Sequence, residues 1–182
     1  AETLSSIKRV IILGTDHYPE GCALSFTRQQ YATPYGILSS DNALIERLAA
    51  MMGEQSAFSG EIHHINEHSV ELAAVWLHKM LKGRSVSLLP ILCGDFHQFE
   101  DDGGDPGHNS TLNEIVAIIQ SEMQKTPTLV VAAADLAHVG IAFGGPAVTS
   151  ANLQMVEQAD SSIIAHICAG DAATFYREAT QL

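Results

Sequence analysis

Short apolar runs alternate with segments of helical periodicity along most of this chain. Continuous apolar runs bounded by turn residues are typical of buried strands, and a 3.6-residue apolar period is typical of amphipathic helices. The runs that predict strands lie at about residues 9–14, 61–65, 86–92 and 129–134. The segments that predict helices are 41–53, 66–83, a stretch that begins at Thr111, 149–169 and 172–180. This alternation indicates an α/β fold, with a mostly parallel or mixed central sheet and helices on both faces.

Capping residues predict where three of these helices begin or end. Asp41 is a good N-cap, and Gly53 would end the helix that follows it. Asn66 is expected to cap the second helix, which begins just after it. Thr111 and Glu114 have the spacing of a capping box, so the third helix is expected to start there.

Two segments fit the alternating pattern less well. Residues 15–40 mix short apolar pieces with turn residues such as Pro34 and Gly36, which predicts a long excursion away from the sheet. Pro90 interrupts the run at 86–92, and a proline suits an edge strand or a bulge better than a central strand.

The composition is that of an ordinary globular protein. With 182 residues, 46% hydrophobic and 16% charged, the chain is expected to form one α/β domain over residues 1–182. It has no apolar stretch of the roughly 18 to 20 residues needed to span a bilayer, and its first residues lack the pattern of a signal peptide. A cytoplasmic protein with no membrane partner is therefore expected.

The charge and the cysteines argue against nucleic-acid binding and against a disulfide-stabilised fold. The formal net charge of −12 makes nucleic acid an unexpected partner, because phosphate binding relies on Lys and Arg. The three cysteines are Cys22, Cys93 and Cys168, an odd and widely spaced set that argues against a disulfide framework. Cys93 follows a buried run and is expected to be a small core residue rather than a nucleophile.

Ionisable residues follow three of the apolar runs, and they are the candidates for chemistry. Asp16 and His17 follow the first run, Glu67 and His68 follow the second, and the third cluster comes after 129–134. The carboxyl ends of parallel strands share one edge of a sheet, where open α/β folds build their sites. The three clusters are therefore expected to converge at this edge.

Each of the first two clusters also has a structural interpretation. His17 would be a metal ligand or a general base influenced by Asp16, or alternatively a loop histidine bonded to the backbone. Glu67 lies at a helix N-terminus, where a carboxylate is stabilised whether or not it has a function. The neighbouring His63 and His64 would point to opposite faces of a strand and are both expected at the surface.

The third cluster contains Asp135 and His138, which are three residues apart directly after a strand. Side chains with this spacing in a helical turn face the same side, so the two could share a ligand. An aspartate can also orient an imidazole by fixing its tautomer. The alternative is that Asp135 is a helix N-cap and His138 is unrelated to it.

An acidic loop at residues 95–105 has a composition that suggests calcium binding. It lacks the spacing and the terminal Glu of an EF-hand loop, so a solvated loop is expected there. The chain also contains no P-loop, no dinucleotide-binding fingerprint and no G-x-S-x-G elbow.

Several of these segments, in this order and spacing, resemble the Memo family, also called AmmeMemoRadiSam system protein B. They are Ile12-Leu13-Gly14-Thr15-Asp16-His17, Cys22-Ala23-Leu24-Ser25, Tyr31-Ala32-Thr33-Pro34, Glu67-His68-Ser69-Val70-Glu71, Leu89-Pro90-Ile91-Leu92 and Ala134-Asp135-Leu136-Ala137-His138. The resemblance runs from about residue 8 to 142 and continues loosely through the helices beyond.

The resemblance implies a fold related to the class III extradiol ring-cleaving dioxygenases, which use non-haem iron. It implies that His17 and His138 are metal ligands with Asp135 beside them, and that Fe(II), or alternatively copper or zinc, binds there. If the protein is an enzyme, it would carry out oxygen chemistry on a small aromatic substrate, with His68, Glu67 and Asp135 as catalytic residues.

Two departures from the family pattern leave a second function open. Family members begin with a strand leading to a His-Ala-Gly-Tyr motif that supplies a further ligand, and this sequence starts after that point. They also carry a Cys- or Gly-containing segment beyond the place where this sequence stops, at Leu182. The chain is therefore expected to be a fragment, or a divergent short member whose site holds no metal. In the latter case the pocket would bind a peptide or a small-molecule ligand without turnover. The sequence does not predict the oligomeric state.

Overall fold

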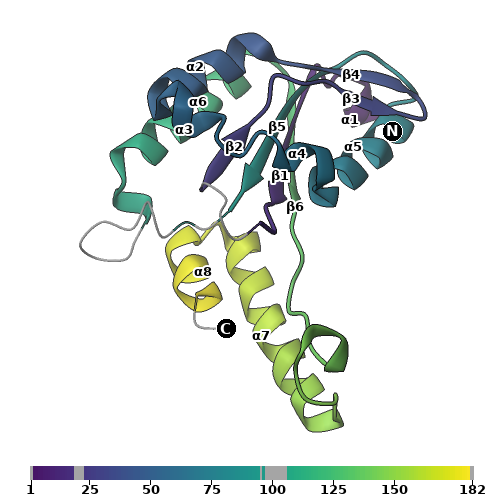
Figure 1. Cartoon of the computed structure of the whole chain (residues 1–182), viewed down its shortest axis with the longest axis vertical. Coiled ribbons are helices and arrows are strands. Elements are labelled where there is room, and N and C mark those ends of the chain that lie inside the picture. The colour runs from purple at the N-terminus through teal and green to yellow at the C-terminus, as the bar shows by residue number, and fades with distance from the viewer. Residues whose placement is uncertain (1, 19–22, 95, 97–105, 181–182) are drawn as a thin grey trace. The chain divides into compact units, whose positions relative to one another are not determined.

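The structure of the protein is a computed structural model that describes residues 2–18, 23–94, 96 and 106–180. The chain divides into two compact units, Ala1–Ala134 and Asp135–Leu182. The first unit contains the sheet and most of the helices, and the second is helical (Figure 1).

The first unit has six strands and several helices. The strands are β1 (Arg9–Thr15), β2 (Leu24–Phe26), β3 (Tyr31–Thr33), β4 (Gly36–Ser40), β5 (Ser87–Cys93) and β6 (Thr128–Ala133). The helices are α1 (Glu2–Ser5), α2 (Asn42–Met52), α3 (Glu54–Ala57), α4 (His63–Asn66), α5 (His68–Met80), the 3₁₀ helix η2 (Pro106–His108) and α6 (Ser110–Lys125).

The strands form one mixed, mostly parallel sheet. The order is β3-β4-β5-β1-β6, and β2 pairs with the end of β5. β1 is parallel to both β5 and β6, and β4 is parallel to β5. The pairs β2–β5 and β3–β4 are antiparallel. The predicted α/β fold with a mostly parallel or mixed sheet is thereby confirmed.

Alternating side chains of the central strands fill two separate cores. Ile11 of β1 packs with α2 and α6 on one face of the sheet. Val10 and Ile12, its neighbours in β1, pack with α5 on the other face. This alternation follows from the two-residue period of a strand. Helices therefore cover both faces, as predicted, and Figure 1 shows α2 and α6 on one side and α5 on the other.

The predicted strand at 61–65 is wrong, because this segment is a run of helical turns that ends in α4. The amides of Glu61, His63 and His64 bond to carbonyls three residues earlier. The apolar pair Ile62 and Ile65 is 62% and 71% exposed, so it contributes no strand to the core. Two isoleucines three apart share one face of a helical turn, whereas a strand would place them on opposite faces.

Residues 15–40 are not an excursion from the sheet, since they contain β2, β3 and β4. The turn residues Pro34 and Gly36 connect the antiparallel pair β3–β4, in which Thr33 pairs with Gly36. Gly36 has a φ of 126°, a conformation that favours glycine. The sequence predicts the turn, whereas the strands on either side of it, three and five residues long, are too short to show a clear period.

Pro90 lies in a central strand, contrary to the prediction of an edge or bulge. β5 pairs with β4 at Ser87 and Leu88, and with β2 from Ile91 onward. Pro90 falls in the gap between these two partners, where a residue without an N–H donor is tolerated. The gap depends on how two other strands end, which the local sequence does not reveal.

Two of the predicted caps are wrong by one or two residues. Asp41 does cap α2, because its side chain accepts a hydrogen bond from the Leu44 amide, and Gly53 ends the helix with a φ of 84°. The N-cap of α5 is Glu67 rather than Asn66. The cap of α6 is Asn109, which accepts from the Leu112 amide, rather than Thr111.

The second unit confirms both helices that the sequence predicts there. It consists of the 3₁₀ helix η3 (Ile141–Phe143), α7 (Ser150–Ala169) and α8 (Ala172–Ala179). Thr149 and Asn152 form a capping box at the start of α7. No helix in the part of the chain that the structure describes has both the length and the apolar character needed to cross a membrane.

Candidate functional site

The N-terminus of α5 lies against the carboxyl end of β1, and this contact brings the first two clusters together. A Cβ atom at Gly14 would come within 2.6 Å of both Ser69 Oγ and Val70 Cγ2. The Ser69 hydroxyl donates to the carbonyl of Thr15 at 2.8 Å. Only a glycine at position 14 leaves space for this approach. As a result, Glu67 and His68 lie next to His17.

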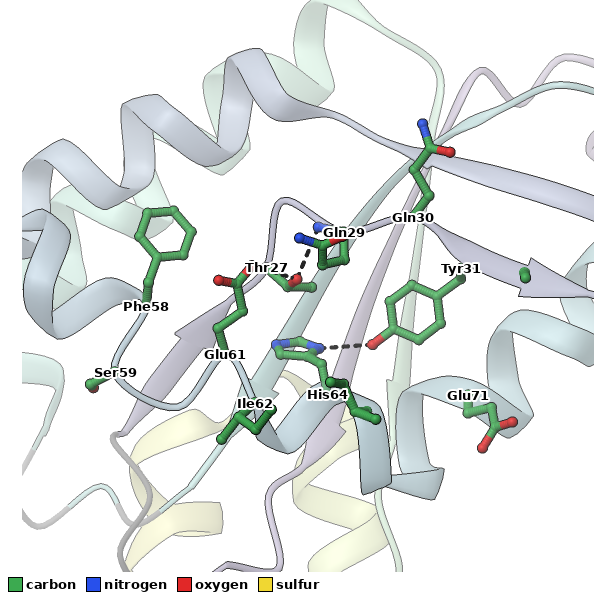
Figure 2. A pocket seen from close by; sticks show the side chains of 12 residues that line it. Thr27, Gln29, Gln30, Tyr31, Phe58, Ser59, Glu61, Ile62, His64 and Glu71 are labelled. Carbon is green, nitrogen blue, oxygen red and sulfur yellow. Dashed lines mark hydrogen bonds between the residues drawn. The ribbon is translucent and has the colours of Figure 1, made fainter.

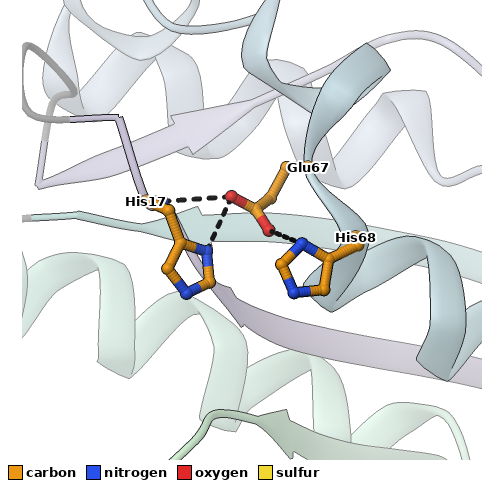
Figure 3. A group of neighbouring side chains, drawn as sticks. All are labelled: His17, Glu67 and His68. Atoms are coloured by element: carbon orange, nitrogen blue, oxygen red, sulfur yellow. Dashed lines mark hydrogen bonds and ion pairs between the residues drawn. The ribbon is translucent and has the colours of Figure 1, made fainter. Parts of the chain in front are cut away.

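His17, Glu67 and His68 form a compact cluster (Figure 3). The backbone N–H and the ring Nδ1 of His17 each lie 3.0 Å from Glu67 Oε2. His68 Nδ1 lies 3.3 Å from Glu67 Oε1. The two imidazole rings are stacked with their centroids 5.2 Å apart. The carboxylate thus holds one imidazole on each of its oxygens.

The Glu67 carboxylate is almost fully buried, whereas both imidazoles face solvent. Its side chain is 2% exposed, against 42% for His17 and 66% for His68. Burial alone would raise the pKa of Glu67. Hydrogen bonds from the His17 amide and ring and from the Ser69 amide outweigh burial and lower this pKa to about 2. The site is therefore a fixed negative charge beneath two accessible imidazoles.

The donor set of this cluster fits a transition metal. One ligand atom from each of the three residues can be chosen so that all three lie within 4.8 Å of one another. Two imidazoles and one carboxylate form the ligand set of non-haem Fe(II) oxygenases, and imidazole also suits copper and zinc. The exposure of both rings gives an ion a route into the site.

Asp16 has a different partner from the one that the sequence suggested. Its carboxylate, which is fully buried, lies 2.8 Å from Nδ1 of His63 and accepts the amide of Tyr18. The Tyr18 ring stacks on the His63 ring at 4.3 Å. Asp16 therefore orients His63, which the sequence placed at the surface. The sequence does contain a signal that His63 lies near the site: His63 and Glu67 are four residues apart, a spacing that places both side chains on one face of a helical turn.

His64 is buried, which also contradicts its predicted surface position. Its Nε2 donates to the carbonyl of Ser25 at 3.1 Å, and its Nδ1 accepts from the hydroxyl of Tyr31 at 2.8 Å. Burial lowers the pKa of His64, which keeps the ring neutral. His64 is thus a structural histidine whose two nitrogens are both used within the protein.

The third cluster lies in the second unit of the chain. Asp135 Oδ2 is 3.3 Å from His138 Nε2, so the predicted pairing of these two side chains is present. The His138 ring also packs edge-on against Phe143, with their centroids 4.7 Å apart. The metal-ligand role of His138 and the catalytic role of Asp135 stay predictions.

Cys93 is a core residue, as the sequence indicates. It packs against the core that contains Ile11, and burial raises the pKa of its thiol to about 12. A thiol with so high a pKa is not a nucleophile at neutral pH. Cys22 and the acidic loop, apart from Phe96, lie outside the residues that the structure describes.

Comparison with known proteins identifies the family. The model of the Memo-like protein family matches residues 2–182. A MEMO1 family protein of Methanosarcina acetivorans is 26% identical over 136 residues, which cover 75% of this chain and 46% of that relative. A MEMO1 family protein of Aquifex aeolicus is 25% identical over 138 residues, which cover 75% of this chain and 33% of that relative. The chain therefore spans less than half the length of these two curated relatives. Because the family model covers almost the whole sequence, the chain belongs to the Memo-like protein family.

Proposed function

We propose that this chain binds one transition-metal ion through His17, Glu67 and His68, and that the metal centre carries out dioxygenase-type chemistry on a small aromatic substrate. The observation that supports this most directly is the stacked pair of exposed imidazoles on one buried carboxylate. Fe(II) is the metal that this ligand set favours for oxygen chemistry, with copper or zinc as alternatives.

The residues of the site would act mainly by holding their partners in place. Glu67, with a pKa of about 2, stays ionised at neutral pH and would anchor the two imidazoles and neutralise part of the charge of a cation. Iron bound there would supply the redox chemistry that activates dioxygen. Glu67 does not take up a proton near neutral pH. The role of a metal ligand therefore suits it better than the predicted role in proton transfer.

The alternative is a protein that uses the same site to bind a peptide or a small molecule without turnover. The exposure of both rings is compatible with a ligand that sits over the site as well as with a reaction in it. The charge of −12 and the small number of Lys and Arg residues disfavour phosphate-rich ligands. We also propose that the protein works in the cytoplasm, since its described cysteines Cys93 and Cys168 are free thiols.

Metal loading under anaerobic conditions tests the proposal. The chain is incubated with Fe(II), Cu(II) or Zn(II), desalted, and analysed for bound metal by mass spectrometry. We expect about one ion per chain, and a loss of affinity of at least about tenfold in His17→Ala and in His68→Ala, because each removes one of three ligands. Oxygen uptake with catechol as substrate then separates turnover from binding.

The matched control is His108→Ala, which removes an exposed histidine from η2 outside the cluster and should leave metal binding unchanged.

His138→Ala tests the ligand role that the sequence predicts for that residue. A chain that takes up none of the three metals at stoichiometric levels would contradict the metal site. Stoichiometric iron without oxygen uptake would favour the binding alternative.

A further inference from the structure

The first unit contains a cavity that lies apart from the His17, Glu67 and His68 cluster. Its volume is about 700 Å³, and it lies between the segment that leads into β3 and the turns that lead into α4 (Figure 2). Its walls include Tyr31, Phe58, Glu61, His64 and Glu71. None of the three residues of the metal cluster lines it. The cavity is therefore a separate site, lined by other residues than the proposed metal site.

The hydroxyl of Tyr31 can only accept hydrogen bonds from a ligand in this cavity. The His64 ring donates through Nε2 to the carbonyl of Ser25, so its Nδ1 is an acceptor in the neutral ring. The Tyr31 hydroxyl must then donate its proton to Nδ1, 2.8 Å away. The lone pairs of the phenol oxygen remain, and they attract a donor from the ligand.

Two carboxylates add further acceptors to the walls. Glu61 is held in place because its Oε1 accepts from the hydroxyl of Thr27 at 2.8 Å and from the amide of Arg28 at 3.0 Å. Its Oε2 makes no hydrogen bond within the described parts of the chain. The carboxylate of Glu71, at the exposed side of α5, likewise has no ion-pair partner among the residues that the structure describes.

The charge and the aromatic rings of the cavity favour a cation. No Lys or Arg is among the described residues that line it, and the chain as a whole carries a net charge of −12. The Phe58 ring already holds one cation, the guanidinium of Arg28, at 3.8 Å from its centroid. The charge of that guanidinium is compensated by Glu46 and Glu54, at 2.5 and 2.7 Å.

We propose that this cavity binds an organic cation: an ammonium or amidinium group carried on an apolar or aromatic body. The cationic N–H groups would donate to Glu61, Glu71 and the phenol oxygen of Tyr31. The apolar body would lie against Phe58 and the exposed side chain of Ile62, which also line the cavity.

Three planar compounds of nearly the same shape test this proposal. Benzamidinium is a cation, benzamide is neutral and benzoate is an anion, so the comparison isolates the effect of charge. Each is titrated into the whole isotope-labelled chain and followed by amide chemical shifts. We expect saturable shifts around Tyr31, Phe58 and Glu61 with benzamidinium, at least about tenfold weaker binding of benzamide, and no binding of benzoate.

Glu71→Gln should weaken the binding of benzamidinium by about fivefold, which is the loss expected for one partly exposed ion pair. This position is exposed, so the variant is expected to fold. Glu61→Gln keeps an acceptor for Thr27 and should weaken binding further, whereas Glu114→Gln on the exposed side of α6 is the matched control and should have no effect. Equal binding of all three compounds, shifts that lie elsewhere, or benzamidinium binding unchanged in both cavity variants would overturn the proposal.

Discussion

Histidines only four positions apart in this protein occupy opposite environments. His64 is 8% exposed, and both its nitrogens are bonded to Ser25 and Tyr31. His68 is 66% exposed and contacts the carboxylate of Glu67 and the ring of His17. Burial lowers the pKa of His64, which keeps it neutral and structural. A histidine is therefore available for metal or substrate only where the fold leaves its ring accessible.

The boundary between these two environments is the end of α4. His64 lies inside α4 and points to the core side near β2 and β3. Glu67 ends α4 and begins α5, so the chain changes direction there and presents His68 to solvent. A buried carboxylate at this junction therefore serves both regions, as the cap of a helix and as the anchor of two imidazoles.

The largest effect is expected from Glu67→Ala. This change removes the α5 N-cap and leaves the partly buried amides of His17 and Ser69 without their acceptor. We expect a loss of about 3 to 4 kcal/mol in the free energy of unfolding, measured by urea denaturation, from the cap and the unsatisfied donors together. Metal binding should be lost as well, because both imidazoles lose their anchor.

Glu114→Ala, at an exposed position of α6, is the matched control and should change stability by less than about 0.5 kcal/mol. If Glu67→Ala were as stable as this control, Glu67 would not be the side chain that both caps α5 and anchors the two imidazoles.

The surroundings of Glu67 and of His64 should lose stability at different pH values as the solution is made acidic. The pKa of Glu67 falls from an ordinary 4.5 to about 2 in the folded protein, so the unfolded chain takes up this proton first as the pH falls. The stability that Glu67 contributes is present above about pH 4.5 and is lost toward pH 2, by roughly 3 kcal/mol in total. The pKa of His64 is also lowered in the folded protein. The unfolded chain therefore takes up this proton first as the pH falls below the ordinary pKa of 6.5, and the stability that His64 contributes begins to fall there.

Urea denaturation at a series of pH values measures both contributions. Glu67→Gln should remove the part of the pH dependence below about 4.5, and His64→Gln should remove the part that begins near 6.5. A pH profile that neither variant alters would show that the two side chains do not have the environments described above.

The smallest effect is expected from Tyr31→Phe. The change removes the hydroxyl that donates to Nδ1 of the buried His64 and leaves that nitrogen without its donor. We expect a loss of about 1 to 2 kcal/mol in the free energy of unfolding and no change in metal binding. Tyr35→Phe, at an exposed tyrosine, is the control. A change in metal affinity in Tyr31→Phe alone would show that the two regions are coupled.

The strands and helices with strong patterns were predicted well. β1, β5, β6 and the helices α2, α5, α7 and α8 lie close to their expected positions, because each has several apolar residues with one clear period. The prediction of a strand around Ile62 and Ile65 is wrong because two apolar residues are too few to establish a period, and their three-residue spacing in fact fits a helical turn. β2 and β3 were missed because three-residue strands are stabilised by their neighbours in the sheet rather than by their own sequence.

The candidate site was predicted in part. The expectation that His17 and the pair Glu67–His68 converge is met, although the second cluster reaches the site from a helix N-terminus and not from a strand. The partnership of Asp16 with His63 was not foreseen, since it depends on the helical turns before α4.

Local sequence is enough to specify the alternation of strands and helices, the helices on both faces of the sheet and the residue types available for chemistry. These follow from the period of apolar side chains and from local capping chemistry, which act over a few residues. Only long-range contacts bury Glu67 and keep it ionised, keep His64 neutral, and stack His17 and His68 over one carboxylate. The reason is physical: burial and hydrogen bonding set the charge of a side chain, and both depend on residues that lie up to fifty positions away along the chain.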